Sequence, residues 1–346
     1  MSISRRDLLK LAGVAGAASV TPVFAQAPAL EKKDVTIAVG GQALIYYLPL
    51  SIANIKGYFK DEGLNAQVID FAGGSKALQA VVGGSADVVS GAFEHTITLQ
   101  SKGQAYRAFA QQGRAPMIVL VVSNKTMADY KTPADLKGKK IGVTAPGSST
   151  NMMASFFLAQ HGLKPTDVSF IGVGAGAGAI TAMRTGQIDA MANLDPVIST
   201  LVKEDAVKVI ADTRTLKDTL QIFGGNMPSG CMYTSQAFID KYPNTTQALA
   251  NAIVRADKWI QAASPDEIAS VVPKSYLLGD PDLYKLALVG NKEALSPDGS
   301  VPEDGPQTAL KALAAFVPNF PTDSIDISKV WTNDFVVKAN KKYPHA

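Results

Sequence analysis

Residues 68–94, VIDFAGGSKALQAVVGGSADVVSGAFE, decide the fold, because they read as strand, Gly-Gly-Ser turn, amphipathic helix, turn and strand. A similar pattern, VSFIGVGAGAGAITAMRTGQIDAMANLD, follows at 168–195. Matching motifs recur at offsets of 104 residues (Val39 and Val143), 99 residues (Gly63 and Gly162) and 102 residues (Gly84 and Gly186). Nearly constant offsets predict an internal duplication, with chance matching of common Gly and Asp as the alternative.

Strands and helices alternate on both sides of these units. Each half reads as βαβαβ, which predicts an α/β fold of two parallel-sheet lobes with right-handed crossovers. We expect strands at 35–40, 66–71, 87–90, 106–110, 117–122, from 141, 168–173, 190–194, 207–211 and 229–234. We expect helices at 48–56, from 75, from 96, and at 151–160, 177–184, 248–262 and 307–316.

The chain is expected to cross between the lobes twice. Strand 117–122 leads to the first crossing, and 229–234 is the return. We therefore expect lobe 1 at 35–122 plus 235–346, and lobe 2 at 123–234, which includes both crossings. The C-terminal helices have no strands of their own and should pack back onto lobe 1. Two connecting segments between lobes predict a hinge.

The N-terminus indicates export. SRRDLLK at 4–10 precedes a small and apolar run at 11–20, and VFA at 23–25 offers a cleavage site. This predicts a twin-arginine signal peptide over 1–25 and a periplasmic location, with a basic amphipathic surface helix as the alternative.

Composition describes a near-neutral globular protein. The chain has 346 residues, 47% hydrophobic and 18% charged, which is long enough for two domains. Without 1–25 it loses three basic residues and one acidic residue, so its formal charge falls from +3 to +1. No clustered basic and aromatic surface for nucleic acid is apparent.

The residues give little support for enzymatic chemistry. Cys231 is the single cysteine, which excludes an intramolecular disulfide and reads as a core residue. The three histidines lie far apart, and zinc-protease, nucleophile-elbow and P-loop motifs are absent. We expect no enzyme, metal or cofactor. One motif keeps an alternative open: GAGAGA at 174–179, with Asp195 21 residues after Gly174, fits a dinucleotide-dependent oxidoreductase.

Candidate site residues lie at the carboxyl ends of the expected strands, where glycine-rich turns and helix N–H groups bind ligands. Ser148, Ser149 and Thr150 are the first candidates, although one of them could simply cap the next helix. Tyr46 and Tyr47 read either as an aromatic wall for an organic ligand or as packing beneath the first helix.

Three charged or titratable candidates complete this set. Glu94 would favour an amine or a ring N–H, and His95 reads as a ligand contact or as a structural hydrogen-bonding group. Arg114 could pair a carboxylate or sulfonate, or be solvated.

Taken together, these residues resemble the periplasmic solute-binding proteins of ABC importers, in the class for nitrate, taurine and aliphatic sulfonates, bicarbonate and thiamine-pyrimidine precursors. The motifs are GYFKDEGL (57–64), AGGSKALQA (72–80), GSADVVSG (84–91), DLKGKKIGV (135–143), PGSST (146–150) and WTNDF (331–335). The resemblance covers nearly the whole mature chain. It implies a type II periplasmic-binding-protein fold and a monomer that closes on one ligand. By position it places ligand contacts at Gln42, Tyr46, Gly74, Ser75, Gly91, Ala92, Ser148–Thr150 and Asn193–Asp195.

The resemblance implies a function without catalysis. We expect capture of a small organic anion of the sulfonate, nitrate or carboxylate type and delivery to a membrane permease with a cytoplasmic ATPase. Residues 93–95 match no substrate subgroup. A pyrimidine or amine-bearing ligand, and a sensory role in place of import, stay open.

Overall fold

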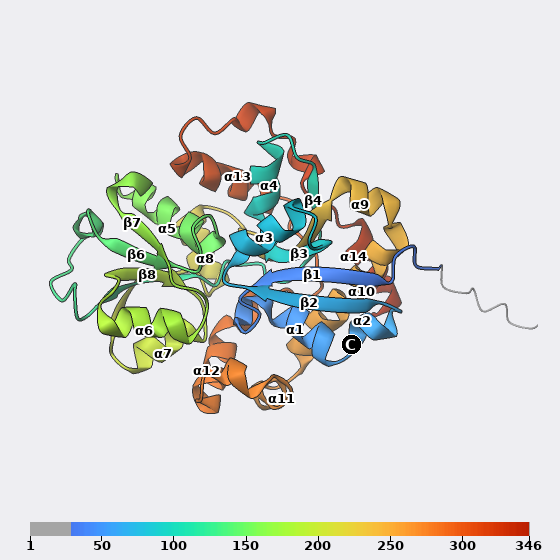
Figure 1. Ribbon diagram of the computed structural model, residues 1–346, viewed down its shortest axis with the longest axis horizontal. Helices are drawn as coiled ribbons and strands as arrows, with labels where there is room; N and C mark the ends of the chain where they lie inside the picture. Colours follow the sequence, from blue (N-terminus) through green and yellow to red (C-terminus); the bar gives the residue numbers. More distant parts are fainter. Residues whose placement is uncertain (1–28, 346) are drawn as a thin grey trace, which may run out of the picture.

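The computed structural model describes residues 29–345, so the predicted signal peptide, 1–25, lies outside the described residues. Two α/β lobes lie side by side along the long axis of the molecule, each built on a five-stranded sheet (Figure 1). The predicted two-lobe α/β fold is confirmed.

The first sheet has the strand order β2-β1-β3-β10-β4. Its strands are β1 (Asp34–Gly40), β2 (Asn65–Phe71), β3 (Val88–Ala92), β4 (Tyr106–Gln111) and β10 (Gly230–Ser235). Strand β1 is parallel to β2 and β3, whereas β10 is antiparallel to β3 and β4.

The second sheet repeats this arrangement with the order β7-β6-β8-β5-β9. Its strands are β5 (Val119–Ser123), β6 (Lys140–Val143), β7 (Ser169–Gly172), β8 (Ala190–Asn193) and β9 (Val207–Asp212). Strand β6 is parallel to β7 and β8, and β5 is antiparallel to β8 and β9. Each sheet is thus mixed rather than purely parallel, because the strand that enters from the other lobe runs against its neighbours.

The matched motifs of the two halves adopt the same local structure. Gly63 and Gly162 have φ of 82° and 75°, and Gly84 and Gly186 have φ of 78° and 79°, a left-handed conformation that favours glycine. Two aspartates also match: a carboxylate oxygen of Asp87 accepts from the Thr36 N–H at 2.9 Å, and that of Asp189 accepts from the Lys140 N–H at 2.9 Å. Shared strand order and shared turns support the duplication.

Helices cover both faces of the sheets. They are α1 (Leu48–Ile55), α2 (Tyr58–Asp61), α3 (Gly74–Val82), α4 (Glu94–Gln100), α5 (Ser149–Gln160), α6 (Ala177–Thr185), α7 (Val197–Lys203), α8 (Leu216–Phe223), α9 (Gln236–Lys241), α10 (Pro243–Ala262), α11 (Pro265–Val271), α12 (Pro281–Asn291), α13 (Gly305–Phe316) and α14 (Asp334–Lys342). The 3-10 turns are η1 (Ile45–Tyr47), η2 (Pro133–Leu136), η3 (Pro165–Asp167), η4 (Lys274–Leu277), η5 (Lys292–Ala294), η6 (Thr322–Ser324) and η7 (Ile327–Lys329).

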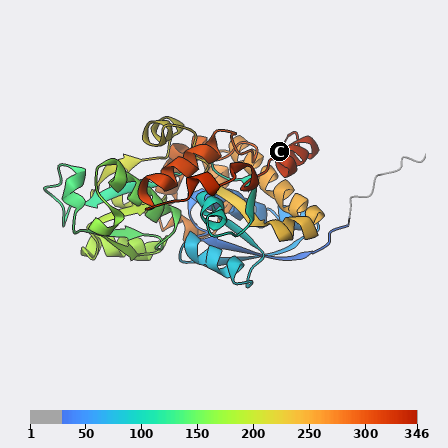
Figure 2. The ribbon, with the colours of Figure 1, turned by 90° about the horizontal axis from the view of Figure 1, so that it is seen from above.

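The C-terminal helices reach both lobes. Helix α10 packs against α1, α2 and α14, which agrees with the expected return to the first lobe. Helix α13, however, lies across the boundary (Figure 2) and contacts both α4 of the first lobe and α5 of the second. Helix α12 contacts α7 of the second lobe. The C-terminal segment therefore spans the boundary between the lobes.

Strand pairing supports crossings at other residues than the expected 122 and 234. Strand β5 belongs to the second sheet and β10 to the first, so we propose that the chain crosses at 112–118 and at 213–229. The crossings are bonded to each other, because the Thr213 N–H donates to the Ile118 carbonyl at 3.0 Å. After each crossing, the chain first forms a strand of the sheet in the lobe that it enters. This strand is β5 in the second sheet and β10 in the first.

Candidate functional site

The lobes touch where α3 and α5 begin. The Ser75 N–H donates to Ser148 Oγ at 3.0 Å, and the Ser75 hydroxyl donates to the Pro146 carbonyl at 2.8 Å. The Ser148 hydroxyl lies 3.2 Å from Ser75 Oγ. The two serines thus face each other across the boundary, and in this conformation they bind each other.

His95 makes a second bridge between the lobes. Its Nε2 lies 3.2 Å from the Gly147 carbonyl, and its Nδ1 lies 2.9 Å from the Tyr233 hydroxyl. A carbonyl only accepts, so Nε2 carries the proton and Nδ1 accepts from Tyr233. Burial lowers the pKa of His95 to about 4, against the opposing effect of the bond to Gly147. A neutral imidazole that joins two lobes favours the structural reading of His95.

A partly enclosed pocket, here called the interlobe pocket, lies between α4, α5 and α13 and has a cavity volume of about 20 Å³. Its polar lining residues are Glu94 and Ser149. Its apolar walls are Met152, Met153 and Phe156 of α5, Ala309, Ala312, Leu313 and Phe316 of α13, and Pro116, Ile118, Phe223 and Met227 from or next to the crossings. In this closed conformation the cavity has room for about one water molecule, well below the ~300–1,000 Å³ range of small-molecule pockets.

Glu94 is the one ionisable group among the residues that line this pocket. The residue is 6% exposed, and burial raises the pKa of its carboxyl to about 7, against the opposing effect of its own backbone N–H. Within residues 29–345, no side chain is hydrogen-bonded to this carboxyl group.

Tyr46 and Tyr47 form a buried layer next to Glu94. They are 2% and 3% exposed, and their rings meet edge to face with centroids 4.7 Å apart. Burial raises the pKa of both phenols, and the charge of Glu94 raises it further. Both side chains belong to the hydrophobic core and do not line the pocket, so the structure favours packing over an aromatic wall.

Several other predicted residues have structural partners. The Gln42 N–H donates to Asp70 at 2.9 Å, and Thr150 Oγ1 accepts from the Thr144 N–H at 3.0 Å. A Cβ on Gly91 would lie 3.0 Å from the Tyr233 ring, and one on Gly74 would lie 3.5 Å from the Tyr47 hydroxyl oxygen. Ala92 is buried within β3. Whether these residues touch a ligand stays a prediction.

Arg114 does not line the interlobe pocket. Its Nε donates to the Glu293 carbonyl at 2.8 Å, next to the crossings. Arg114 therefore lies in the proposed first crossing, 112–118, and is bonded to the turn η5.

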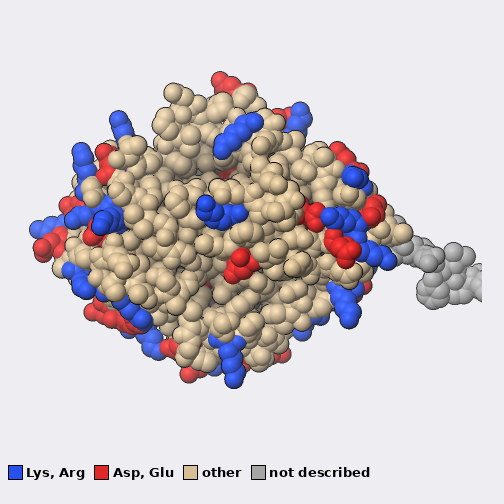
Figure 3. Space-filling view, in the orientation of Figure 1, with Lys and Arg blue, Asp and Glu red and all other residues tan. Residues whose placement is uncertain are grey.

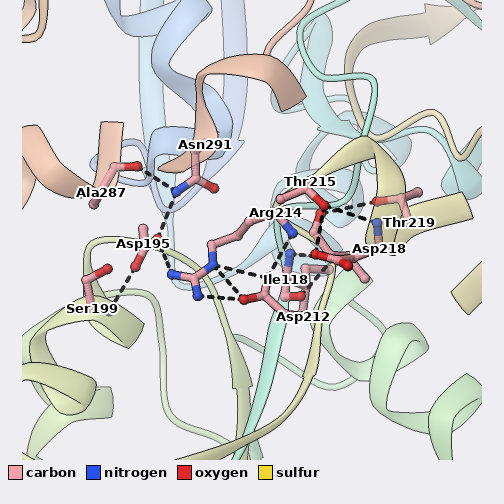
Figure 4. A network of polar contacts seen from close by, with 11 residues as sticks. Ile118, Asp195, Ser199, Asp212, Arg214, Thr215, Asp218, Thr219, Ala287 and Asn291 are labelled. Carbon is pink, nitrogen blue, oxygen red and sulfur yellow. Dashed lines mark hydrogen bonds and ion pairs between the residues drawn. The ribbon is translucent and has the colours of Figure 1, made fainter. Parts of the chain in front are cut away.

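Asn193 and Asp195 are each held by polar contacts, and those of Asp195 are drawn in Figure 4. Asn193 donates to the Gly174 carbonyl at 3.1 Å. One oxygen of Asp195 accepts from the Ser199 N–H at 2.8 Å, and the other accepts from Asn291 at 2.8 Å and from Arg214 at 3.2 Å. Asp195 and its Arg214 partner belong to the second lobe and the return crossing, whereas Asn291 ends α12.

This network weakens the dinucleotide alternative. Asp195, the acid that would hold the ribose, already pairs with Arg214 and Asn291. The glycine motif follows β7, an edge strand, rather than a strand at the centre of its sheet. Within residues 29–345, no group of three or more metal-ligating side chains is present.

Most of the residues that line the interlobe pocket were not predicted from the sequence. Met152, Phe156, Leu313 and Phe316 lie in the expected helices 151–160 and 307–316, but none of them was predicted to line a site. Their apolar character was visible, but two helices 150 residues apart in the chain meet only in the folded protein.

The outer surface carries mixed charges. On the face shown in Figure 3, basic and acidic side chains alternate around the margin, and the middle, where the lobes meet, has few of either. In residues 29–345, every helix is too short or too polar to cross a membrane.

Comparisons with known proteins agree with this geometry. The sequence profile of the NMT1-like family matches residues 29–273, and that of the twin-arginine translocation signal matches residues 2–22. The signal match supports the predicted export to the periplasm.

Two solved structures share the fold. A protein from Bordetella bronchiseptica RB50 is 68% identical, with a TM-score of 0.91 over 92% of this chain and 100% of that chain. The periplasmic nitrate-binding protein NrtA from Synechocystis PCC 6803 is 17% identical, with a TM-score of 0.73 over 91% of this chain and 90% of that chain. The latter similarity concerns the fold alone.

Curated relatives divide between two kinds of protein. YtlA of Bacillus subtilis (strain 168), named as a binding protein, is 24% identical over 83% of this chain and 85% of its own length. The 4-amino-5-hydroxymethyl-2-methylpyrimidine phosphate synthase of Candida albicans (strain WO-1) is 25% identical over 67% of this chain and 69% of its own length.

Proposed function

Because this chain belongs to the NMT1-like family, we propose that it is an exported receptor that encloses a small organic solute between its lobes and passes it unchanged to a membrane permease with a cytoplasmic ATPase. The observation that carries the proposal is the interlobe pocket, whose walls come from both lobes. Closing the lobes would complete those walls, and opening them would release the solute.

The bridges between the lobes support such a cycle. Ser75, Ser148 and His95 make contacts that are formed only when α3 and α5 meet. Each is a single hydrogen bond with a net value of about 0.5–1.5 kcal/mol, so the contacts are weak enough to break during opening.

The pocket does not support the expected organic anion. The described residues that line it include no lysine or arginine, and the Ser75 N–H at the start of α3 already donates to the Ser148 hydroxyl oxygen just before α5. The nitrate named for the cyanobacterial protein therefore gives no guide to the solute of this chain.

We also propose that the chain is not an enzyme. Solved relatives of the same fold include the nitrate-binding protein, whereas the Candida relative is named as a synthase. The interlobe pocket presents one carboxyl, one serine hydroxyl and apolar side chains, which suit binding better than group transfer.

Mass spectrometry of the exported protein tests the function. We expect one solute to copurify, and we expect its return at 100 times its Kd to stabilise the stripped protein by about 2.7 kcal/mol. Deleting the gene for this chain should stop uptake of the same compound. Absence of a copurified solute, with no melting shift from sulfonates, nitrate, carboxylates, pyrimidines or amines, would refute the proposal. Turnover of the solute by the purified chain alone would instead show an enzyme.

A further inference from the structure

Asp257 is a buried carboxyl group that the proposed function does not use. It belongs to α10, it is fully buried, and neither of its side-chain oxygens has a hydrogen-bond partner among the residues that the structure describes. Carboxylates are almost never fully buried unless they are paired, because removal from water penalises the charge. Burial and the charge of Asp298 raise the pKa of Asp257 well above its ordinary 3.8, so the neutral acid is the form that fits this position.

No cation offsets a negative charge at this position. Among residues 29–345, Asp298 is the one charged group that affects the pKa of Asp257, and it carries a negative charge as well. The basic side chains on α10 and the segments around it that have other partners are Lys56, Arg107, Arg255, Lys258, Lys292 and Lys342. The acids Asp61 and Glu62 are the partners of two of these, and the remaining charged side chains of α2, α9 and α14 are exposed. Loss of its proton would therefore leave Asp257 as an uncompensated charge inside the first lobe.

Asp257 lies on the face of α10 that packs against the loop after η5. Val254 and Gln261, three residues before and four residues after Asp257, share this face of the helix. A Cβ on Gly299 would lie 2.9 Å from Val254 Cγ2, and Gln261 Nε2 donates to the Leu295 carbonyl at 3.3 Å. Asp257 is therefore placed between two contacts that join α10 to this loop.

This loop belongs to a segment, residues 291–299, that is hydrogen-bonded to both proposed crossings and is here called the hinge clasp. Toward the first crossing, the Ser296 N–H donates to the Gln112 carbonyl at 2.9 Å, and the Arg114 N–H donates to the Ala294 carbonyl at 2.8 Å. Toward the return crossing, the carboxylate of Glu293 accepts from the Leu216 N–H at 2.8 Å. A change that moves the hinge clasp off α10 would loosen contacts of both crossings.

From this arrangement we propose that Asp257 is a proton-dependent latch: the neutral acid lets the hinge clasp stay packed on α10, and loss of the proton to solvent releases the clasp, so that water reaches the carboxylate. The inference goes beyond the proposed function and does not depend on which solute, if any, the chain binds. In the released form Asp257 ionises at its ordinary pKa. The latch is therefore fully effective below about pH 4, and its release should become about tenfold more frequent per pH unit above that, until Asp257 ionises in the packed form too.

Amide hydrogen exchange of the ligand-free, full mature chain tests the latch between about pH 5 and about pH 9. At each pH the exchange rate of the Ser296 and Arg114 amides in wild type is divided by the rate in Asp257→Asn, which cancels the intrinsic effect of pH on exchange. This ratio should rise with pH by up to about tenfold per unit, and both amides should exchange before those of β1 in the core of the lobe. Asp323→Asn, the same change at an exposed carboxyl, is the control and should exchange like wild type. A constant ratio, or release of these amides only together with β1, would overturn the inference.

Infrared spectroscopy detects the proton itself and does not need Asp257→Asn to fold. Glu94 is the other acid among the described residues whose pKa is raised by burial, so Glu94→Gln removes its contribution. At about pH 7 the spectrum of Glu94→Gln should still contain the C=O band of a protonated carboxylic acid. Bands of ionised carboxylates alone would contradict the latch. Because neither measurement uses a solute, the latch and the receptor function can fail independently of each other.

Discussion

Glu94 and His95 are neighbours in the chain, and burial shifts the pKa values of their side chains in opposite directions. The pKa of Glu94 rises from its ordinary 4.5 to about 7, so burial keeps its proton on. The pKa of His95 falls from its ordinary 6.5 to about 4, so burial keeps its second proton off. Both shifts favour the uncharged form, as expected where a closed lobe boundary excludes water.

These shifts predict opposing pH dependences of stability. As pH falls from about 6.5 to about 4, unfolded His95 takes up a proton first, so its contribution to the free energy of unfolding decreases. As pH rises from about 4.5 to about 7, unfolded Glu94 loses its proton first, so its contribution also decreases. Between about 4.5 and about 6.5 the two slopes cancel.

Single substitutions should reveal how each residue makes the free energy of unfolding depend on pH. The measurement is urea titration of the ligand-free protein at different pH values. In Glu94→Gln the free energy of unfolding should rise with pH by up to about 1.4 kcal/mol per unit relative to wild type, and in His95→Gln it should fall with pH by a similar amount. His161→Gln, at an exposed histidine, is the control. Parallel curves for all three variants would contradict the prediction.

At the scale of elements, α13 is the feature that turns a lobe boundary into a pocket. It follows the other C-terminal helices in the chain but contacts α5 of the second lobe as well as α4 of the first. Four of its residues line the pocket, and two of these are alanines, Ala309 and Ala312. Small side chains on this face leave the cavity between α5 and α13 unfilled.

Filling that room should abolish binding without unfolding the protein. Ala312→Leu places three more carbons at a position that is 5% exposed and borders the pocket, so we expect solute affinity to fall by more than about tenfold. The free energy of unfolding should fall by about 1–3 kcal/mol, because three more carbons overpack a cavity of about 20 Å³.

The matched control is Ala314→Leu, which makes the same change on the exposed side of α13. Calorimetry with the copurified solute compares the two variants. Equal affinities of Ala312→Leu and wild type would show that the solute lies elsewhere.

At the scale of the whole molecule, contacts at the far side of the boundary join α12 to the second lobe. Asn291 is fully buried and donates to Asp195, which also pairs with Arg214. Lys203 of α7 pairs with Asp280, the N-cap of α12, at 2.5 Å, but this pair is more exposed. Closure is therefore held by one buried and one exposed polar contact on this side.

Removing the buried contact should favour the open form. Asn291→Ala deletes a hydrogen bond to a charged group, worth about 1.5–3 kcal/mol, which shifts a closing equilibrium roughly ten- to hundredfold. We expect weaker solute binding and a larger radius of gyration in small-angle X-ray scattering. Lys203→Ala removes an exposed pair worth up to about 1 kcal/mol and serves as the control. If Asn291→Ala keeps the wild-type radius and affinity, α12 does not take part in closure.

The sequence by itself determined the elements and the repeat. Helix 151–160 was found at Ser149–Gln160 and strand 207–211 at Val207–Asp212, because apolar periodicity and turn residues are local properties of the chain. The glycines at 63 and 162 could be matched without a structure, since a left-handed turn limits the choice of residue. Two lobes, export and the family class followed from these patterns.

Only the tertiary structure decided which sheet the strands β5 and β10 join and which side chains line the interlobe pocket. Strands β5 and β10 are equally apolar wherever they pair, so their sheet depends on partners about a hundred residues away. The sequence named Ser75, Ser148 and Glu94 alike as candidates for ligand binding. It does not say which of them lines a pocket and which forms a hydrogen bond to the other lobe. Burial and partnership arise only when distant segments pack, and these made Ser75 and Ser148 a bridge and left Glu94 in the lining of the interlobe pocket.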